Sequence, residues 1–142
     1  MIEFDLSCVI SFGIGFENGF SDENATMETI TQKTNLKEIR KNNFESEVLL
    51  SNVPVLLEFG ASWCGPCHII APGINKLAVE YIGRVKFGLL DIDEDIELKV
   101  KYGVRDLPTI ILFKNGIVED FIVGTKPTLE IKSRLDELLL KV

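Results

Sequence analysis

Three absences narrow what this chain of 142 residues can be. Cysteine is scarce: the chain has only Cys8, Cys64 and Cys67. A secreted disulfide scaffold needs more cysteines, and an odd number cannot all form pairs. No apolar run reaches the roughly 18 residues that a membrane span needs, so we expect no membrane partner. The first residues carry acids where an export signal carries bases, which predicts no signal peptide. These absences favour a globular protein of a reducing compartment, and the predicted location is cytoplasmic.

Positive charge is also scarce, above all at the start of the chain. The net charge is −7, and residues 1–32 hold six acidic residues and no Lys or Arg. Such a balance argues against nucleic acid as a partner, because phosphates require a basic face. Apolar residues make up 46% of the chain, enough for one sizeable core. We therefore predict an acidic N-terminal extension over residues 1–33, partly ordered or flexible, and one domain over 34–142.

The extension itself carries two patterns. Ile2, Phe4 and Leu6 alternate with polar residues, as in a strand, whereas residues 17–34 are polar throughout, as in a linker. We favour an appendage that packs on the domain or frays. The alternative is a strand that joins a sheet edge of this chain or of a partner. Cys8 is expected to be an unpaired thiol.

The domain alternates between strand and helix patterns. Strands are predicted over 36–39, 53–59, 85–92, 109–113 and 117–123, and helices over 43–50, 66–82 and 94–102 and from Pro127 onward. Asn115 and Gly116, between the last two strands, are a strong hairpin signal. This order predicts an α/β fold with a central mixed sheet and helices on both faces.

Two cysteines lie where a predicted strand ends and a predicted helix begins. At a helix start the free N–H groups and the helix dipole favour a thiolate over a thiol at Cys64. Gly65 keeps the turn tight, and Pro66 suits a first helical turn, where a missing N–H costs nothing. Cys67 follows one turn later, so the pair can close a small reversible disulfide, which indicates redox chemistry. The predicted inward face of the helix consists of Ile69, Ile70, Ile74, Leu77, Ala78 and Tyr81.

The sequence around these cysteines, Trp63-Cys64-Gly65-Pro66-Cys67, resembles the active site of the thioredoxin family. The resemblance extends over roughly residues 35–142. It includes a central strand at 54–59, a helix-kinking proline at Pro72, a cis-proline loop at Leu107-Pro108-Thr109, the hairpin at 114–116 and a bordering glycine at Gly124.

This resemblance implies a thioredoxin-like fold and a protein disulfide reductase. Cys64 is then the nucleophile that forms a mixed disulfide with a client protein, and Cys67 is the resolving cysteine. The client-binding residues that it implies are Trp63, Gly65, Pro66, Leu107, Pro108 and Gly124. The partners that it implies are clients with disulfides and a flavin-dependent thioredoxin reductase. We expect no bound cofactor and a monomer.

Glu58 is the third catalytic candidate. The family has a buried aspartate at this position, which exchanges a proton as the resolving cysteine reacts; here the side chain is one methylene longer. Many members also carry a lysine beside that acid, and the matching residue here is Leu89. A carboxyl group in an apolar strand, without a cation, should have a raised pKa, as a proton shuttle requires. The alternative is that Glu58 points outward into solvent.

Other interpretations of the site remain open at this stage. A zinc site needs four ligands, and only Cys8 and His68 could join the pair, so we predict no metal. Cys64 to His68 also match the C-x-x-C-H pattern of haem attachment, but a preceding strand and an internal proline argue against it. Pro108 could instead form a trans turn, and Trp63 could be a core aromatic. The alternative functions are an exported thiol oxidase or isomerase and a non-catalytic binding module of the same fold.

Overall fold

The structure, a computed structural model, describes residues 35–141. The predictions for the acidic extension, including the strand pattern of Ile2 to Leu6 and the state of Cys8, lie outside the described residues. The chain divides into two units between Thr34 and Asn35, and the described residues belong to the second unit. None of the helices in the described range is long and apolar enough to cross a membrane.

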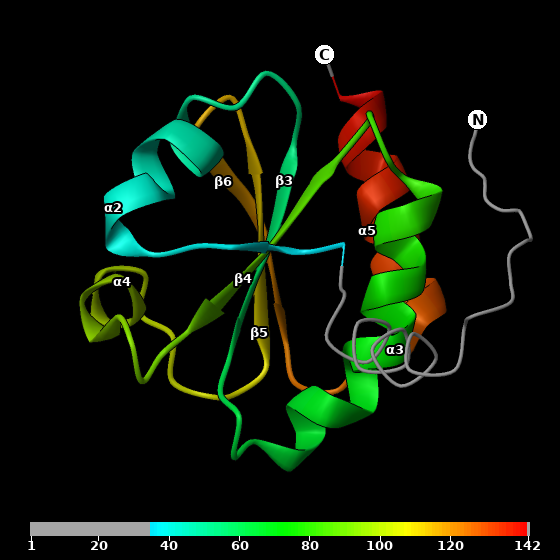
Figure 1. Ribbon diagram of the computed structural model, residues 1–142. Coiled ribbons are helices and arrows are strands. Elements are labelled where there is room, and N and C mark those ends of the chain that lie inside the picture. Colours follow the sequence, from blue (N-terminus) through cyan, green and yellow to red (C-terminus); the bar gives the residue numbers. More distant parts are fainter. Residues whose placement is uncertain (1–34, 142) are drawn as a thin grey trace, which may run out of the picture. The chain divides into compact units, whose positions relative to one another are not determined.

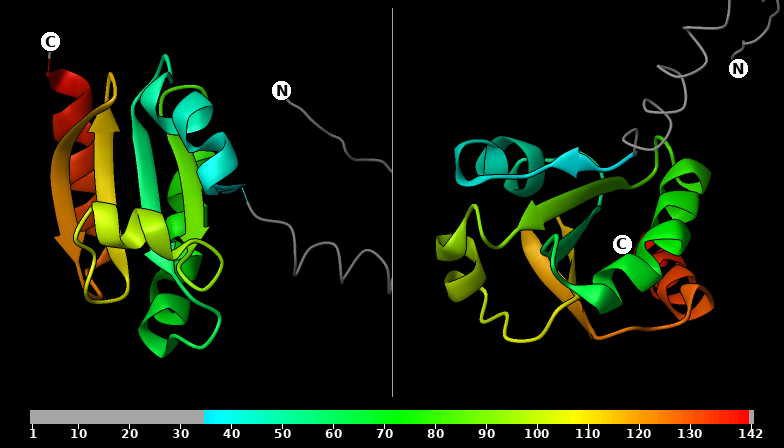
Figure 2. Two further views of the ribbon diagram at one scale, coloured as in Figure 1. Left: turned by 90° about the vertical axis from the view of Figure 1, so that its left-hand side faces the viewer. Right: turned by 60° about the horizontal axis from the view of Figure 1, so that its bottom comes forward.

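A five-stranded mixed sheet forms the centre of this unit (Figure 1). Its strands are β2 (Lys37–Glu38), β3 (Val55–Gly60), β4 (Lys86–Asp91), β5 (Thr109–Lys114) and β6 (Ile117–Val123), in the order β2-β4-β3-β5-β6. The first three run parallel to one another, and β5 and β6 follow antiparallel to their neighbours. The left panel of Figure 2 shows β6, β5, β3 and β4 side by side. Every residue of β3 is buried, because this strand has a neighbour at each edge and a helical layer on each face.

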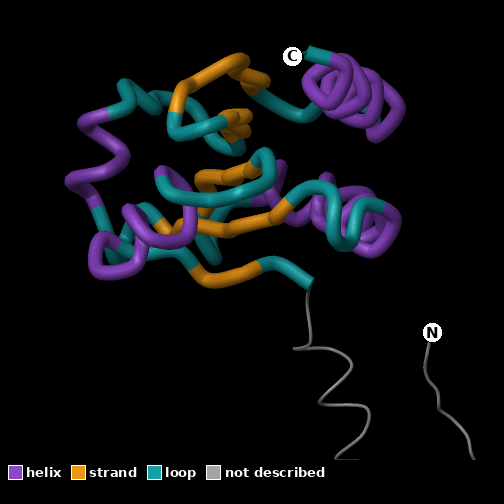
Figure 3. Tube along the Cα trace, turned by 90° about the horizontal axis from the view of Figure 1, so that it is seen from above, coloured by secondary structure: helices purple, strands orange, loops and turns teal. Residues whose placement is uncertain are grey.

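Two layers of helices cover the two faces of the sheet (Figure 3). One layer consists of α3 (Gly65–Glu80) and α5 (Thr128–Leu140). The other consists of α2 (Lys41–Phe44), its π-helical continuation η1 (Glu45–Leu49) and α4 (Ile96–Lys101). The predicted mixed sheet with helices on both faces is therefore confirmed.

Each helical layer encloses its own apolar core against the sheet. Leu56 points into the core beneath α3 and α5, whereas its neighbour Leu57 points into the core beneath α2 and α4. This alternation follows from the period of two residues along a strand. Glu58 lies two residues after Leu56 and therefore shares its face, on the side of α3.

The long helix α3 departs from the prediction at one residue. Ile69 was predicted to face inward, but 70% of it is exposed. Ile70, Ile74 and Leu77 already complete the buried stripe, and Ile69 lies about 100° round the helix from Ile70, so it points to solvent. Pro72 lies inside α3, as predicted, where it cannot donate a backbone hydrogen bond, and the ribbon of α3 changes direction along its length (Figure 1).

The hairpin between β5 and β6 forms where the sequence predicts it. Asn115 and Gly116 have φ angles of 55° and 78°, the left-handed pair that a tight two-residue hairpin turn requires. A Cβ on Gly116 would also lie 2.8 Å from the carbonyl oxygen of Leu49. Glycine is therefore required at this position for two independent reasons.

Candidate active site

Four segments meet at one end of the sheet and form the candidate site. Phe59 pairs with Leu90 on one side and with Thr109 on the other, and Thr109 pairs with Val123. The end of β3, the end of β4, the segment before β5 and the end of β6 therefore lie at the same sheet edge. Residues more than sixty positions apart in the sequence meet here only because of this register.

Cys64 and Cys67 form a disulfide at the start of α3, with their Cα atoms 5.3 Å apart. Cys64 is the N-cap residue of α3, and its Sγ accepts a hydrogen bond of 3.1 Å from the backbone N–H of Cys67. Its own N–H donates to the carbonyl oxygen of Ala61. Both cysteines are buried, while Gly65 and Pro66 between them are exposed. A sulfur at this position receives an N–H group and the positive end of the helix dipole, which stabilise negative charge on it.

The cis-proline loop lies beside the end of β6. The Leu107–Pro108 peptide bond is cis, so the trans alternative is wrong. The N–H of Gly124 donates a hydrogen bond of 2.8 Å to the carbonyl oxygen of Pro108. Gly124 has a φ of 88°, which a residue with a side chain rarely adopts. Leu107 is half-buried and Pro108 is buried, so this loop is part of the packed framework of the site.

Trp63, immediately before the disulfide, is held at the surface. Its side chain is 65% exposed, so it is not a core aromatic. Its indole Nε1–H donates a hydrogen bond of 2.7 Å to Asp93 Oδ2, on the loop after β4. Asp93 in turn donates its backbone N–H to Asp91 Oδ1. Sequence reasoning did not find Asp93, because no local pattern distinguishes it from the other acids of its loop.

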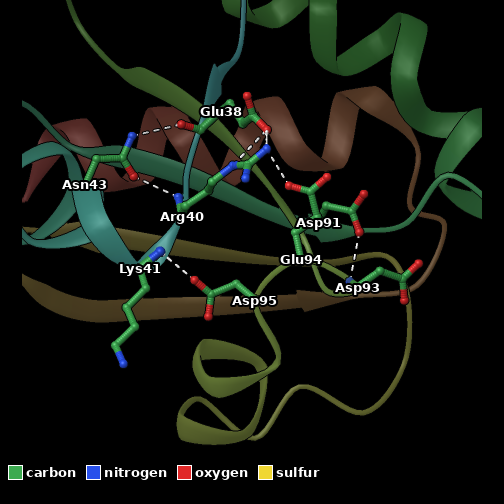
Figure 4. Close-up of polar contacts among 8 residues, drawn as sticks. All are labelled: Glu38, Arg40, Lys41, Asn43, Asp91, Asp93, Glu94 and Asp95. Carbon is green, nitrogen blue, oxygen red and sulfur yellow. Dashed lines mark hydrogen bonds and ion pairs between the residues drawn. The ribbon is translucent and has the colours of Figure 1, made fainter.

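The loop that carries Asp93 is also anchored to the segment that leads into α2 (Figure 4). The guanidinium of Arg40 forms ion pairs with Glu38 and Glu94. Asp95 accepts a hydrogen bond of 2.5 Å from the backbone N–H of Lys41 and a second one from the first turn of α4. One buried carboxylate thus caps the starts of α2 and α4 together, and this fixes the position of the loop next to the site.

Glu58 points inward rather than to solvent. Only 4% of the residue is exposed, and burial raises the pKa of its carboxyl group to about 7. No charged group contributes to that shift among the described residues. Leu89 pairs with Glu58 in the parallel register, so an apolar side chain lies next to the carboxyl on β4. The predicted direction of the shift and its cause are therefore confirmed.

His68 is an exposed residue of the first turn of α3. Its Nε2 lies 2.8 Å from the carbonyl oxygen of Ser62. A carbonyl oxygen can only accept, so Nε2 must carry the proton in this arrangement. Within residues 35–141, no three His, Cys, Asp or Glu side chains gather as a metal site.

The structure therefore brings most of the predicted site residues to one place. Cys64, Cys67 and Trp63 lie at the start of α3, and the cis-proline loop and Gly124 lie together at the same sheet edge. Glu58 lies beneath them, on the strand that leads to the motif. This arrangement provides a reversible disulfide, a sulfur at a helix start and a buried acid that can exchange a proton near neutral pH.

The sequence matches that of known proteins over the same region. The family model described as Thioredoxin matches residues 35–137. Thioredoxin M5, chloroplastic, of Oryza sativa subsp. japonica is 41% identical over 95 residues, which are 67% of this chain and 55% of that protein. Thioredoxin 1 of Nostoc sp. is 37% identical over 102 residues, 72% of this chain and 95% of that protein. A chloroplastic M-type thioredoxin of Pisum sativum is 38% identical over 101 residues, 71% of this chain and 59% of that protein. This chain thus spans little more than half of the two plant proteins but nearly all of the bacterial one.

Proposed function

The chain belongs to the thioredoxin family, and from that membership we propose that it is a thiol–disulfide oxidoreductase that reduces disulfide bonds in client proteins. The observation that carries the proposal is the Cys64–Cys67 disulfide at the start of α3, with Cys64 Sγ accepting an N–H hydrogen bond. A disulfide in this place gives a stabilised thiolate when it is reduced, which is the attacking species in disulfide exchange.

The first step is attack by the Cys64 thiolate on one sulfur of the client disulfide. The client S–S bond breaks, a mixed disulfide forms between Cys64 and the client, and the other client sulfur leaves as a thiolate that takes up a proton. Cys64 is the attacking cysteine because it is the N-cap of α3, where the N–H of Cys67 meets its sulfur.

In the second step Cys67 resolves the mixed disulfide. Its thiol gives its proton to the carboxylate of Glu58, and the resulting thiolate attacks Cys64 Sγ. The bond between Cys64 and the client breaks, and the second client sulfur leaves as a thiolate and is protonated. The client gains two electrons and two protons, and the pair returns to the disulfide. A carboxyl group with a pKa of about 7 is suited to accept and return that proton near neutral pH.

The client segment binds over the surface around the disulfide. The exposed indole of Trp63 and the exposed Gly65 and Pro66 offer an apolar rim on one side. At the same sheet edge, the neighbours of Pro108, whose carbonyl is bonded to Gly124, offer backbone groups to an extended chain.

A thioredoxin reductase recharges the oxidised pair in this proposal, and the protein acts as a monomer. The predicted cytoplasmic location stays a prediction, because the rice and pea relatives are named chloroplastic. The cytoplasm and the plastid are both reducing compartments, which is what the proposed direction of electron flow requires. Imaging of the full chain with a C-terminal fluorescent protein decides between the two.

Reduction of insulin disulfides, coupled to dithiothreitol, tests the function. We expect turnover by the wild type and none by Cys64→Ser. Cys67→Ser should accumulate client proteins as mixed disulfides on Cys64, because the resolving thiol is missing. A wild type that does not reduce insulin, or a reduction potential near the −120 mV of strongly oxidising relatives rather than about −270 mV, would overturn the proposal. Client binding that survives loss of both cysteines would indicate a binding module instead.

A further inference from the structure

Gly60, the last residue of β3, is the point at which the buried acid and the resolving cysteine come together. A Cβ built on Gly60 would lie 3.4 Å from Cys67 Sγ and 3.6 Å from Glu58 Oε2. Because Gly60 follows Glu58 by two residues, both point to the face of the sheet under α3. The space that a side chain would fill at Gly60 is therefore bordered by the two groups between which the proton must move.

The length of the Glu58 side chain makes this space relevant to the reaction. A glutamate extends one methylene further along the strand face than an aspartate at the same position does. Its Oε2 borders the space that a side chain at Gly60 would fill, whereas its strand neighbours in the register, Leu89 and Ile110, are apolar and offer it no hydrogen bond. A methyl group at Gly60 would lie in van der Waals contact with both the carboxylate oxygen and the sulfur.

We propose that Gly60 is a positioning residue for the resolving step: its missing side chain leaves open the space that is bordered by the carboxyl of Glu58 and the sulfur of Cys67, across which the proton passes. The inference rests on the proposed function and adds to it the residue that sets the path of the proton.

Few titratable side chains lie near the space at Gly60. Cys67 comes from α3 and Glu58 from β3. The register partners of Glu58, Leu89 on β4 and Ile110 on β5, are apolar. The partner of Gly60 on β4 is Asp91, whose Oδ1 accepts the backbone N–H of Asp93. Burial alone raises the pKa of Glu58, with no charged group among the causes. The pH dependence of the resolving step should therefore belong to Glu58 and Cys67.

The test follows the resolving step with 5,5′-dithiobis(2-nitrobenzoate). Every protein in this test, the wild-type reference included, carries Cys8→Ser, so that the third thiol of the chain does not react. The reduced protein then releases one thionitrobenzoate when Cys64 attacks the reagent and a second when Cys67 displaces it from Cys64. We expect Gly60→Ala to slow the second release about ten-fold at pH 7, with the first release unchanged, because a methyl group then occupies the space that the general base and the thiol border. The difference should shrink at high pH, where hydroxide in the solvent takes the proton from Cys67.

Glu58→Gln provides the matched background. If Gly60 acts through the carboxyl, adding Gly60→Ala to Glu58→Gln should change the second release by less than about two-fold, because effects that share one group are not additive. Equal slowing by Gly60→Ala in both backgrounds, slowing at all pH values alike, or no slowing at all would overturn the inference. A wild type that releases only one equivalent would instead contradict the proposed function, so the two failures are distinguishable. Circular dichroism of each variant checks that the fold is retained.

Discussion

Glu58 is buried, and no cation among the described residues stabilises its charge. Most buried carboxylates have such a partner. A surface carboxylate keeps its hydration in the folded state, whereas the ionised form of Glu58 lacks the hydration that it has in the unfolded chain. The free energy of unfolding must therefore depend on pH through this one group. The same property makes it a proton acceptor near pH 7.

The sign of that dependence follows from the shift. The pKa of Glu58 rises from 4.5 in the unfolded chain to about 7 in the fold, so between these values the folded state binds more protons. Stability is then fully present below about pH 4.5, falls as the pH rises to 7 and levels off above it, by up to about 3 kcal/mol. We expect Glu58→Gln to remove this slope and to be more stable than the wild type at pH 8. Urea unfolding of the oxidised proteins between pH 4.5 and 8.5 measures it, and equal slopes in both proteins would contradict the prediction.

At the level of the helices, α3 and α5 contact each other at two places. Gly73 of α3 lies directly against Thr128, the first residue of α5. Further along, the hydroxyl of Tyr81 donates to Asp136 and accepts a hydrogen bond of 3.1 Å from Lys132 of α5. The two helices therefore approach closely at one end and are joined by polar groups at the other.

This close approach predicts a specific pair of variants. A Cβ at Gly73 would overlap Thr128 Oγ1 and lie 3.3 Å from Thr128 Cβ and 3.4 Å from its Cγ2, so the side chain of Thr128 must shift. We expect Gly73→Ala to lower the free energy of unfolding by about 1–3 kcal/mol, the usual cost of overpacking. Thr128→Ala in the same protein should recover most of that loss. Thermal or urea denaturation measures both, and a Gly73→Ala variant as stable as the wild type would be inconsistent with the crossing described here.

At the scale of the whole molecule, the site belongs to one unit of the chain. Every residue assigned to it lies within 35–141, and the family match covers 35–137. The disulfide lies at the sheet end where four segments meet, so its surroundings depend on the complete sheet. The acidic residues 1–34 lie outside both the match and the described range.

A shortened protein tests this division. The chain that starts at Asn35 should reduce insulin within about two-fold of the rate of the full-length protein, because every residue assigned to the site, and the whole family match, lies within 35–141. The comparison needs only the two proteins at equal concentration and the same reductant. A loss of most of the activity would mean that residues 1–34 belong to the functional unit.

Much of the fold could be predicted from the sequence, because the signals that determine it are local. The apolar periods of β3 and α3, the Asn115–Gly116 turn and the pattern of Cys64 to Cys67 each lie within a few residues of the chain. The predicted boundaries differ from the observed ones by a few residues. Ile69 was the clear error, because a spacing of three and four residues admits two neighbouring positions and only packing against the sheet selects one.

Neighbours along the chain are enough to predict the order of the elements, the cysteine pair and the presence of an acid on the strand before it. The packed fold is needed to show that Glu58 faces α3, that Asp93 binds the indole of Trp63, and that Gly60 borders both the acid and Cys67. These relations depend on the register between β3, β4 and β5 and on the packing of α3 upon them. Contacts between distant segments arise only when the strands pair and the helices pack on them, and no local pattern encodes them.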